Sequence, residues 1–261
     1  MTVYSPRRAD AWLVSYGERP DAAFRVVCCP HAGGSASYYP WLRTAVPSDV
    51  ELLCLQYPGR QERRREPAIT RFPAMTEAVT EVLRSVADLP LVLFGHSMGS
   101  LIAFETARAL EREGCTVLGL VVSGRRAPSV RPPDGVRKID FAETLAETRA
   151  LGGTDPALLN DPDFLELMLP VLRADYQLAA SYRPEPEAAV SCPLTMLTGD
   201  ADPQVDRAAA EAWRRHTTSD FTLHEVTGGH FFFNDDRPTV VNHLRSALAA
   251  LHPGAADRQL R

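Results

Sequence analysis

The chain has 261 residues, of which 45% are hydrophobic and 23% are charged. These proportions are those of an average globular protein and exclude intrinsic disorder for the bulk of the chain. The formal net charge of −5 leaves no basic field that could hold nucleic acid through its phosphates. No apolar stretch approaches the roughly 20 residues that a membrane-spanning helix needs, and residues 1–21 lack the apolar core of a signal peptide. We therefore expect a cytoplasmic protein with no membrane contact.

Short apolar runs alternate with helical patterns along the chain. The runs are apolar on consecutive residues, which is typical of strands buried on both faces of a sheet. They predict strands at residues 24–29, 50–56, 91–94, 117–123, 194–197 and 221–226, with a weaker one at 12–14. Helical patterns lie between them, for example at 101–113. This alternation favours an α/β fold, a mostly parallel sheet flanked by helices, as a single domain over residues 1–261.

The alternation is interrupted once, between residues 131 and 186. No strand is predicted there, and helical patterns cover 141–151, 156–160 and 163–181. Two of these helices follow an Asp-Pro pair, a typical helix start. The segment predicts a helical lid inserted into the domain, with an oversized crossover as the alternative. Four apolar residues recur in it at helical spacing and could belong to the core or to an acyl pocket: Phe164, Leu167, Met168 and Leu172.

The clearest chemical signal is the segment from Gly95 to Gly99. It has the pattern G-x-S-x-G, follows the predicted strand 91–94 and precedes the predicted helix 101–113. This is the strand–turn–helix context of a nucleophile elbow, whose glycines remove the β-carbons that would collide where strand and helix cross. The pattern predicts Ser97 as the nucleophile of a hydrolase; an ordinary glycine-rich turn is the alternative.

A serine nucleophile needs a histidine base and an orienting acid, which follow it in the order acid, then histidine, in this architecture. Of the seven histidines, His230 is the one in a loop directly after the last predicted strand. The acid should come from the loop after strand 194–197, which offers Asp200 and Asp202. We prefer Asp202, because it lies deeper in the loop and precedes a proline, whereas Asp200 is expected to bind backbone amides of the turn.

Two backbone amides are predicted to form the oxyanion hole. One is the N–H of Met98, directly after the nucleophile, and the other should come from the loop 30–34, with Ala32 as the best candidate. The glycine pair in that loop could instead cradle a phosphate, but the phosphate-loop pattern with its lysine is absent. The five cysteines match no metal-ligand spacing, so neither a metal site nor a disulfide is expected. The predicted chemistry requires no cofactor.

Taken together, five segments resemble the discrete type II thioesterases of polyketide and nonribosomal peptide biosynthesis. They are residues 30–34 (PHAGG), 55–60 (LQYPGR), 95–99 (GHSMG), 199–202 (GDAD) and 229–232 (GHFF). The resemblance covers about residues 12–251. It implies an α/β-hydrolase fold with a helical lid, and hydrolysis of acyl thioesters on the phosphopantetheine arm of acyl or peptidyl carrier proteins, which removes aberrant or stalled units. It also supports Ser97, Asp202 and His230 as the triad, with Ala32 and Met98 as oxyanion donors.

Several alternatives remain open at this point. A carboxylesterase or lipase would use the same triad on oxygen esters, and a fatty-acyl carrier protein thioesterase would prefer medium or long acyl chains. A carrier-binding scaffold with a vestigial triad is the non-enzymatic alternative. The charged run 60–66 either docks an acidic carrier protein through its arginines or is a solvated loop. We expect a monomer.

Overall fold

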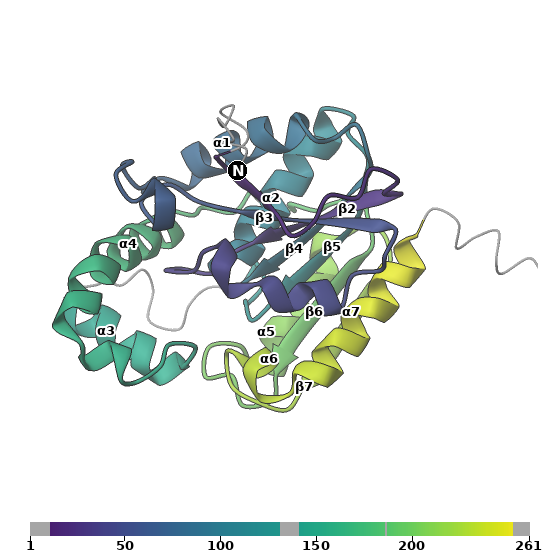
Figure 1. The fold of residues 1–261 in the computed structure, drawn as a ribbon. Helices are drawn as coiled ribbons and strands as arrows, with labels where there is room; N and C mark the ends of the chain where they lie inside the picture. Colours follow the sequence, from purple (N-terminus) through teal and green to yellow (C-terminus); the bar gives the residue numbers. More distant parts are fainter. Residues whose placement is uncertain (1–10, 131–140, 186, 253–261) are drawn as a thin grey trace, which may run out of the picture.

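The computed structural model describes residues 11–130, 141–185 and 187–252 (Figure 1). Its centre is a seven-stranded sheet with the strand order β1-β3-β2-β4-β5-β6-β7. β1 pairs antiparallel with β3, and every other neighbouring pair is parallel. The strands are β1 (Leu13–Ser15), β2 (Phe24–Cys29), β3 (Val50–Leu55), β4 (Leu91–His96), β5 (Val117–Ser123), β6 (Leu194–Gly199) and β7 (Phe221–Val226). The predicted α/β fold with a mostly parallel sheet is confirmed.

The central strands are apolar on consecutive residues because helices cover both faces of the sheet. β4 is buried at every one of its positions, and β2 and β3 are buried at all but one of theirs. All six of the stronger strand predictions are confirmed to within two residues at each end. The weak prediction at residues 12–14 corresponds to β1, a short strand at the edge of the sheet.

Helices form a layer on each side of the sheet (Figure 1). α1 (Phe72–Arg84) and α2 (Met98–Arg112) bury their apolar residues in one core cluster, and α7 (Arg237–Leu251) buries its own in a second cluster on the opposite face. The loop after β2 leads into a pair of 3-10 helices, η1 (Ala36–Tyr38) and η2 (Pro40–Thr44). The remaining short helices are η3 (Gln61–Arg63), α5 (Arg207–Glu211), η5 (Ala212–His216) and α6 (Phe232–Asp235).

The segment between β5 and β6 is helical where the structure describes it. It contains α3 (Phe141–Leu151), η4 (Leu158–Asn160) and α4 (Pro162–Ala180), so the predicted helices are confirmed there. Asp161 caps α4 by accepting the backbone N–H groups of Asp163 and Phe164, as expected from the Asp-Pro pair. Figure 1 shows α3 and α4 side by side, apart from α1, α2 and α7. Residues 131–140, where the predicted insertion begins, lie outside the described residues.

The parallel strands bring four chemically interesting loops to one edge of the sheet. The loop 30–34 follows β2, Ser97 follows β4, Asp202 follows β6 and His230 follows β7. Because the carboxyl ends of parallel strands lie at the same edge, this is where sites form in open α/β sheets. None of the helices in the described part of the chain is long and apolar enough to cross a membrane.

Candidate active site

Ser97 stands in a strained turn between β4 and α2. Its backbone has φ 53° and ψ −118°, a conformation that non-glycine residues rarely adopt. Its N–H donates to the carbonyl of Ser123 at the end of β5, at 2.8 Å. A β-carbon added at Gly99 would overlap the carbonyl oxygen of Cys29, and one at Gly95 would overlap that of Gly99. The expected close crossing of strand and helix is therefore present, and it leaves the Ser97 side chain only half-buried.

His230 and Asp202 form a buried pair at the ends of β7 and β6. The imidazole Nδ1 lies 2.8 Å from Asp202 Oδ2, and the two side chains are 1% and 0% exposed. Asp202 Oδ1 accepts the backbone N–H of Gln204 at 2.8 Å, which orients the carboxylate. With Nδ1–H donating to the acid, the lone pair of the neutral ring is on Nε2. His230 Nε2 is buried and has no hydrogen-bond partner among the described residues.

Asp200, the other carboxylate of this loop, faces the backbone instead. Its Oδ1 accepts the N–H of Gly228 at 2.9 Å, and its own N–H donates to the carbonyl of Val226 at 2.9 Å. Asp200 therefore fastens the loop after β6 to the loop after β7, the two loops that carry Asp202 and His230.

The amides of the loop after β2 are distinguished by their partners. The N–H of His31 donates to the Tyr39 hydroxyl at 3.3 Å, and that of Gly34 to the carbonyl of His31 at 2.9 Å. The N–H of Gly33 donates to the Asp175 carboxylate at 2.7 Å. The Ala32 amide has no acceptor among the residues that the structure describes. Met98 supplies the first amide of α2, which has no acceptor within its own helix.

Sequence reasoning missed a cluster of rings around His230. The His96 and Phe231 ring centroids lie 5.0 Å and 5.3 Å from that of His230, and the His31 and Phe231 centroids are 4.9 Å apart. Burial, with smaller contributions from His230 and Arg60, lowers the pKa of His31 to about 3. Burial, with the neighbouring His230 and His31, lowers the pKa of His96 well below its usual range. Both rings are therefore neutral at pH 7. The sequence offered one indication of this cluster, because His31 and His96 each stand directly before a predicted site residue.

The charged run 60–66 does not present all its arginines to solvent. Arg60 is buried against Asp175 of α4. Arg63 is buried too: it donates to the carbonyl of Gln56 at 2.8 Å, pairs with Glu66 and lies 4.4 Å above the Trp12 ring. The hypothesis that the run docks a carrier protein is therefore wrong for these two arginines, since internal partners occupy both guanidinium groups.

The helical segment 141–180 touches the site loops at three places. Leu172 and Asp175 of α4 lie against Gly33. Gly153 lies against Phe231, where an added β-carbon would be 2.5 Å from two ring atoms. Gln204 Nε2 donates to Glu147 of α3 at 2.5 Å. The four apolar residues of this segment do not share one surface: Leu172 is 3% exposed, Leu167 is 71% exposed, and Phe164 and Met168 are partly buried.

Nothing in the described ranges resembles a metal centre. No group of three or more His, Cys, Asp or Glu side chains there is placed to hold an ion. Cys28, Cys29, Cys54 and Cys192 are buried free thiols, and Cys115 is a partly buried one.

The comparison with known families decides the identity of the fold. A family model described as a thioesterase domain matches residues 24–248. The chain belongs to the thioesterase family. It is 42% identical over 251 residues to the thioesterase PikA5 of Streptomyces venezuelae, covering 95% of this chain and 89% of that protein. The predicted resemblance to this family is confirmed, and with it the α/β-hydrolase type of sheet.

Two solved thioesterase structures resemble this thioesterase over most of its length. The type II thioesterase BorB from the borrelidin biosynthetic cluster is 37% identical, with a TM-score of 0.83 and coverage of 92% of this chain and 99% of BorB. RedJ, from the prodiginine pathway in Streptomyces coelicolor, is 34% identical, with a TM-score of 0.80 and coverage of 88% and 92%.

Proposed function

We propose that this thioesterase hydrolyses acyl thioesters on the phosphopantetheine arm of acyl or peptidyl carrier proteins, and so removes aberrant or stalled units from polyketide or nonribosomal peptide synthases. The observation that carries the proposal is the buried His230–Asp202 pair, whose Nε2 has no hydrogen-bond partner among the described residues, at the same sheet edge as Ser97 in its strained elbow. The likeness to BorB, described as a type II thioesterase of a biosynthetic cluster, supports the substrate class.

In this proposal Ser97 Oγ attacks the thioester carbonyl while His230 Nε2 takes its proton. The same imidazolium then protonates the departing thiolate, which leaves an acyl-serine. A water molecule, deprotonated by His230, attacks the acyl-serine and releases the free acid and Ser97. Asp202 keeps the proton on Nδ1 and stabilises the imidazolium in both steps.

The negative charge that develops on the carbonyl oxygen would be held by the amides of Ala32 and Met98. The support for Ala32 is that its neighbours His31, Gly33 and Gly34 already donate elsewhere, whereas its own N–H has no acceptor among the described residues. Each donor of this kind typically contributes about 10²–10³ in turnover. A thioester has less resonance stabilisation than an ester and a better leaving group, so these groups suffice without a metal or cofactor.

The segment 141–180 would act as a lid. Its support is that it touches the loop after β2 through α4 and the His230 loop through Gly153. A cover of this kind excludes water from the acyl-serine until the leaving group has departed.

The test is the release of free acid from short acyl groups on a phosphopantetheinylated carrier protein, with p-nitrophenyl esters of the same acids alongside. We expect the carrier thioester to have the higher kcat/KM, and Ser97→Ala to lower kcat at least about 10⁴-fold. A preference for the oxygen esters would instead identify a carboxylesterase. A steep rise in rate with acyl length would identify a fatty-acyl carrier protein thioesterase. Failure of a fluorophosphonate to label Ser97 would favour a non-enzymatic scaffold.

A further inference from the structure

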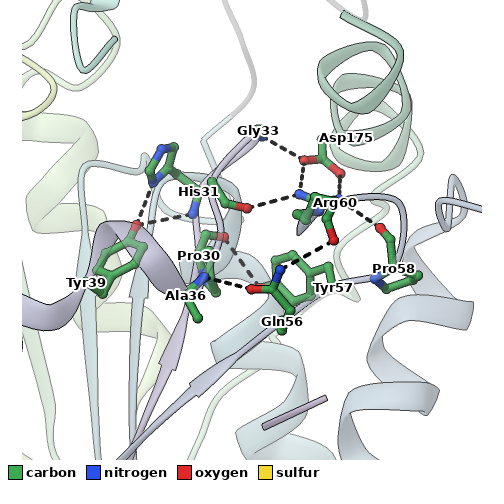
Figure 2. A network of polar contacts seen from close by, with 11 residues as sticks. Pro30, His31, Gly33, Ala36, Tyr39, Gln56, Tyr57, Pro58, Arg60 and Asp175 are labelled. Carbon is green, nitrogen blue, oxygen red and sulfur yellow. Dashed lines mark hydrogen bonds and ion pairs between the residues drawn. The ribbon is translucent and has the colours of Figure 1, made fainter. Parts of the chain in front are cut away.

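A buried ion pair joins α4 to the loop after β3. Arg60 Nη1 lies 2.6 Å from Asp175 Oδ2, and Nη2 lies 2.8 Å from Oδ1, so the contact is bidentate. The two side chains are 5% and 0% exposed and stand 115 positions apart in the sequence. Figure 2 shows them facing each other, with Gly33 beside the carboxylate. A bidentate charge-assisted pair in a dry environment holds its two segments at a defined distance and angle.

The same pair also forms hydrogen bonds with the loop that carries Ala32. Asp175 Oδ2 accepts the N–H of Gly33 at 2.7 Å, and Arg60 Nη1 donates to the carbonyl of Gly34 at 3.2 Å. The loop after β2 is thus held through one N–H and one carbonyl by a carboxylate and a guanidinium that hold each other (Figure 2).

Packing reinforces these bonds. Leu172 lies one turn before Asp175 on α4, and a β-carbon added at Gly33 would be 2.6 Å from Leu172 Cδ2. Gly33 also has φ +75°, which a larger residue adopts only with strain. The Leu172 side chain of α4 therefore packs against the loop at this glycine and leaves no room for a larger residue there.

Through this contact α4 holds the Gly33 N–H, which lies in the peptide group next to the one that carries the Ala32 N–H. The peptide group between Ala32 and Gly33 is planar, so fixing the Gly33 N–H fixes the Ala32 carbonyl and limits the rotation of the residue that carries the free N–H. We propose that Asp175 is a positioning residue for the oxyanion hole. α4 would then help to orient the oxyanion hole in addition to its proposed role in the lid. The inference rests on the proposed role of Ala32.

The primary test is Asp175→Asn, which keeps the shape of the side chain and removes its charge. Turnover is measured on a small acyl-pantetheine thioester and expressed per active site titrated with a fluorophosphonate, so that a misfolded fraction does not count. We expect kcat to fall about 10- to 100-fold with KM within about threefold, because a donor displaced by about an ångström stabilises the transition state less. The Ki of a trifluoromethyl ketone, whose serine adduct carries an oxyanion, should rise by the same factor.

The control is Glu51→Gln. It weakens another arginine–carboxylate contact, the single Arg25–Glu51 bond at 2.7 Å with side chains 16% and 14% exposed, between β2 and β3 near the ends of the strands opposite the site. It should lower the Tm and leave kcat per titrated site and the ketone Ki unchanged. Arg60→Lys retains the charge but cannot make the bidentate contact. We expect a smaller loss in kcat with a parallel change in Ki, and this variant decides the question if Asp175→Asn does not fold.

A kcat within twofold of wild type for Asp175→Asn, or a fall in kcat without a matching rise in Ki, would overturn the inference. A failure of the proposed function is recognised separately. Wild type would then release no acid from the carrier thioester, or Ser97→Ala would remain active, whatever Asp175→Asn does.

Discussion

Asp200 and Asp202 stand two residues apart and face different partners. Asp202 is turned inward onto the imidazole of His230, whereas Asp200 accepts a backbone N–H from the neighbouring loop and is exposed. The first arrangement selects a tautomer of the histidine, and the second joins two loops. In the proposed mechanism only the first contact changes its strength during the reaction.

Substituting each aspartate with asparagine should therefore separate the two roles. Asp202→Asn removes the charge that stabilises the imidazolium and permits the wrong tautomer, and we expect kcat to fall about 10⁴-fold. Asp200→Asn retains an oxygen that accepts the Gly228 N–H, so kcat should stay within about threefold of wild type. The measurement is acid release from the acyl-carrier thioester at pH 7.5. Equal losses in the two variants would contradict the assignment of Asp202 as the orienting acid.

At the scale of elements, α4 has a start that the local sequence encodes and contacts with the loop after β2 that it does not. It begins at a proline after the Asp161 cap and contains Pro170 in its interior, which lacks the N–H of a normal helical bond. Leu172 and Asp175, which touch the loop after β2, follow this proline within two turns. The local sequence therefore determines where the helix begins, and contacts with a distant segment of the chain determine where it packs.

Removing the cap should loosen the start of α4 and leave the rest of the protein unchanged. Asp161→Ala removes the acceptor for two amides, which typically costs about 1 kcal/mol of local helix stability. Hydrogen exchange of the first turn of α4 should become about fivefold faster, while exchange in α7 stays the same. Asp163→Ala is the matched control, because this carboxylate is exposed in the first turn of α4 and is not the capping side chain. Equal acceleration in both variants would contradict the capping role.

At the scale of the whole molecule, the sheet edge buries two neutral histidines that do not take part in the proposed proton transfer. His31 bonds to the Tyr39 hydroxyl and His96 to the Ser123 hydroxyl. Because their pKa values are lowered in the folded protein, the unfolded chain binds protons at these residues at a pH where the folded chain does not. The resulting stability is present above the unfolded pKa of about 6.5 and is lost as the pH falls below it.

The pH dependence of unfolding should therefore change when one of these histidines is replaced. With a folded pKa of about 3, His31 alone should reduce the free energy of unfolding by about 2 kcal/mol between pH 7 and pH 5. In His31→Gln, the decrease in the free energy of unfolding between pH 7 and pH 5 should be about 2 kcal/mol smaller than in wild type. This difference does not depend on how stable the variant is at pH 7. Urea unfolding at the two pH values measures both differences. Parallel losses in wild type and variant would show that His31 is protonated in the folded state.

The agreement between predicted and observed strands has a physical reason. A strand covered on both faces must be apolar at consecutive positions, so β2 through β6 are visible in the sequence itself. The elbow around Ser97 is also local, since strand, tight turn and helix follow one another within about 20 residues. β1 was only a weak prediction, because three residues at a sheet edge carry little pattern.

The environment of the charged run 60–66 could not be predicted in this way. In the sequence, Arg60 and Arg63 belong to a segment rich in charged residues, a pattern typical of a solvated loop. Their burial depends on partners that the local sequence does not identify, Asp175 on α4 for Arg60 and the Trp12 ring for Arg63. Desolvation of a charge is a property of the packed chain, and no local periodicity reports it.

The sequence by itself determined the class of the fold and the strand–turn–helix around Ser97, because each depends on burial patterns or turn chemistry over a few residues. Only the tertiary structure decided which aspartate meets His230, which histidines are buried as neutral rings, and that α4 is bonded to the loop of Ala32. These features join residues from distant parts of the chain. They exist only where packing has excluded water and made each unpaired polar group costly.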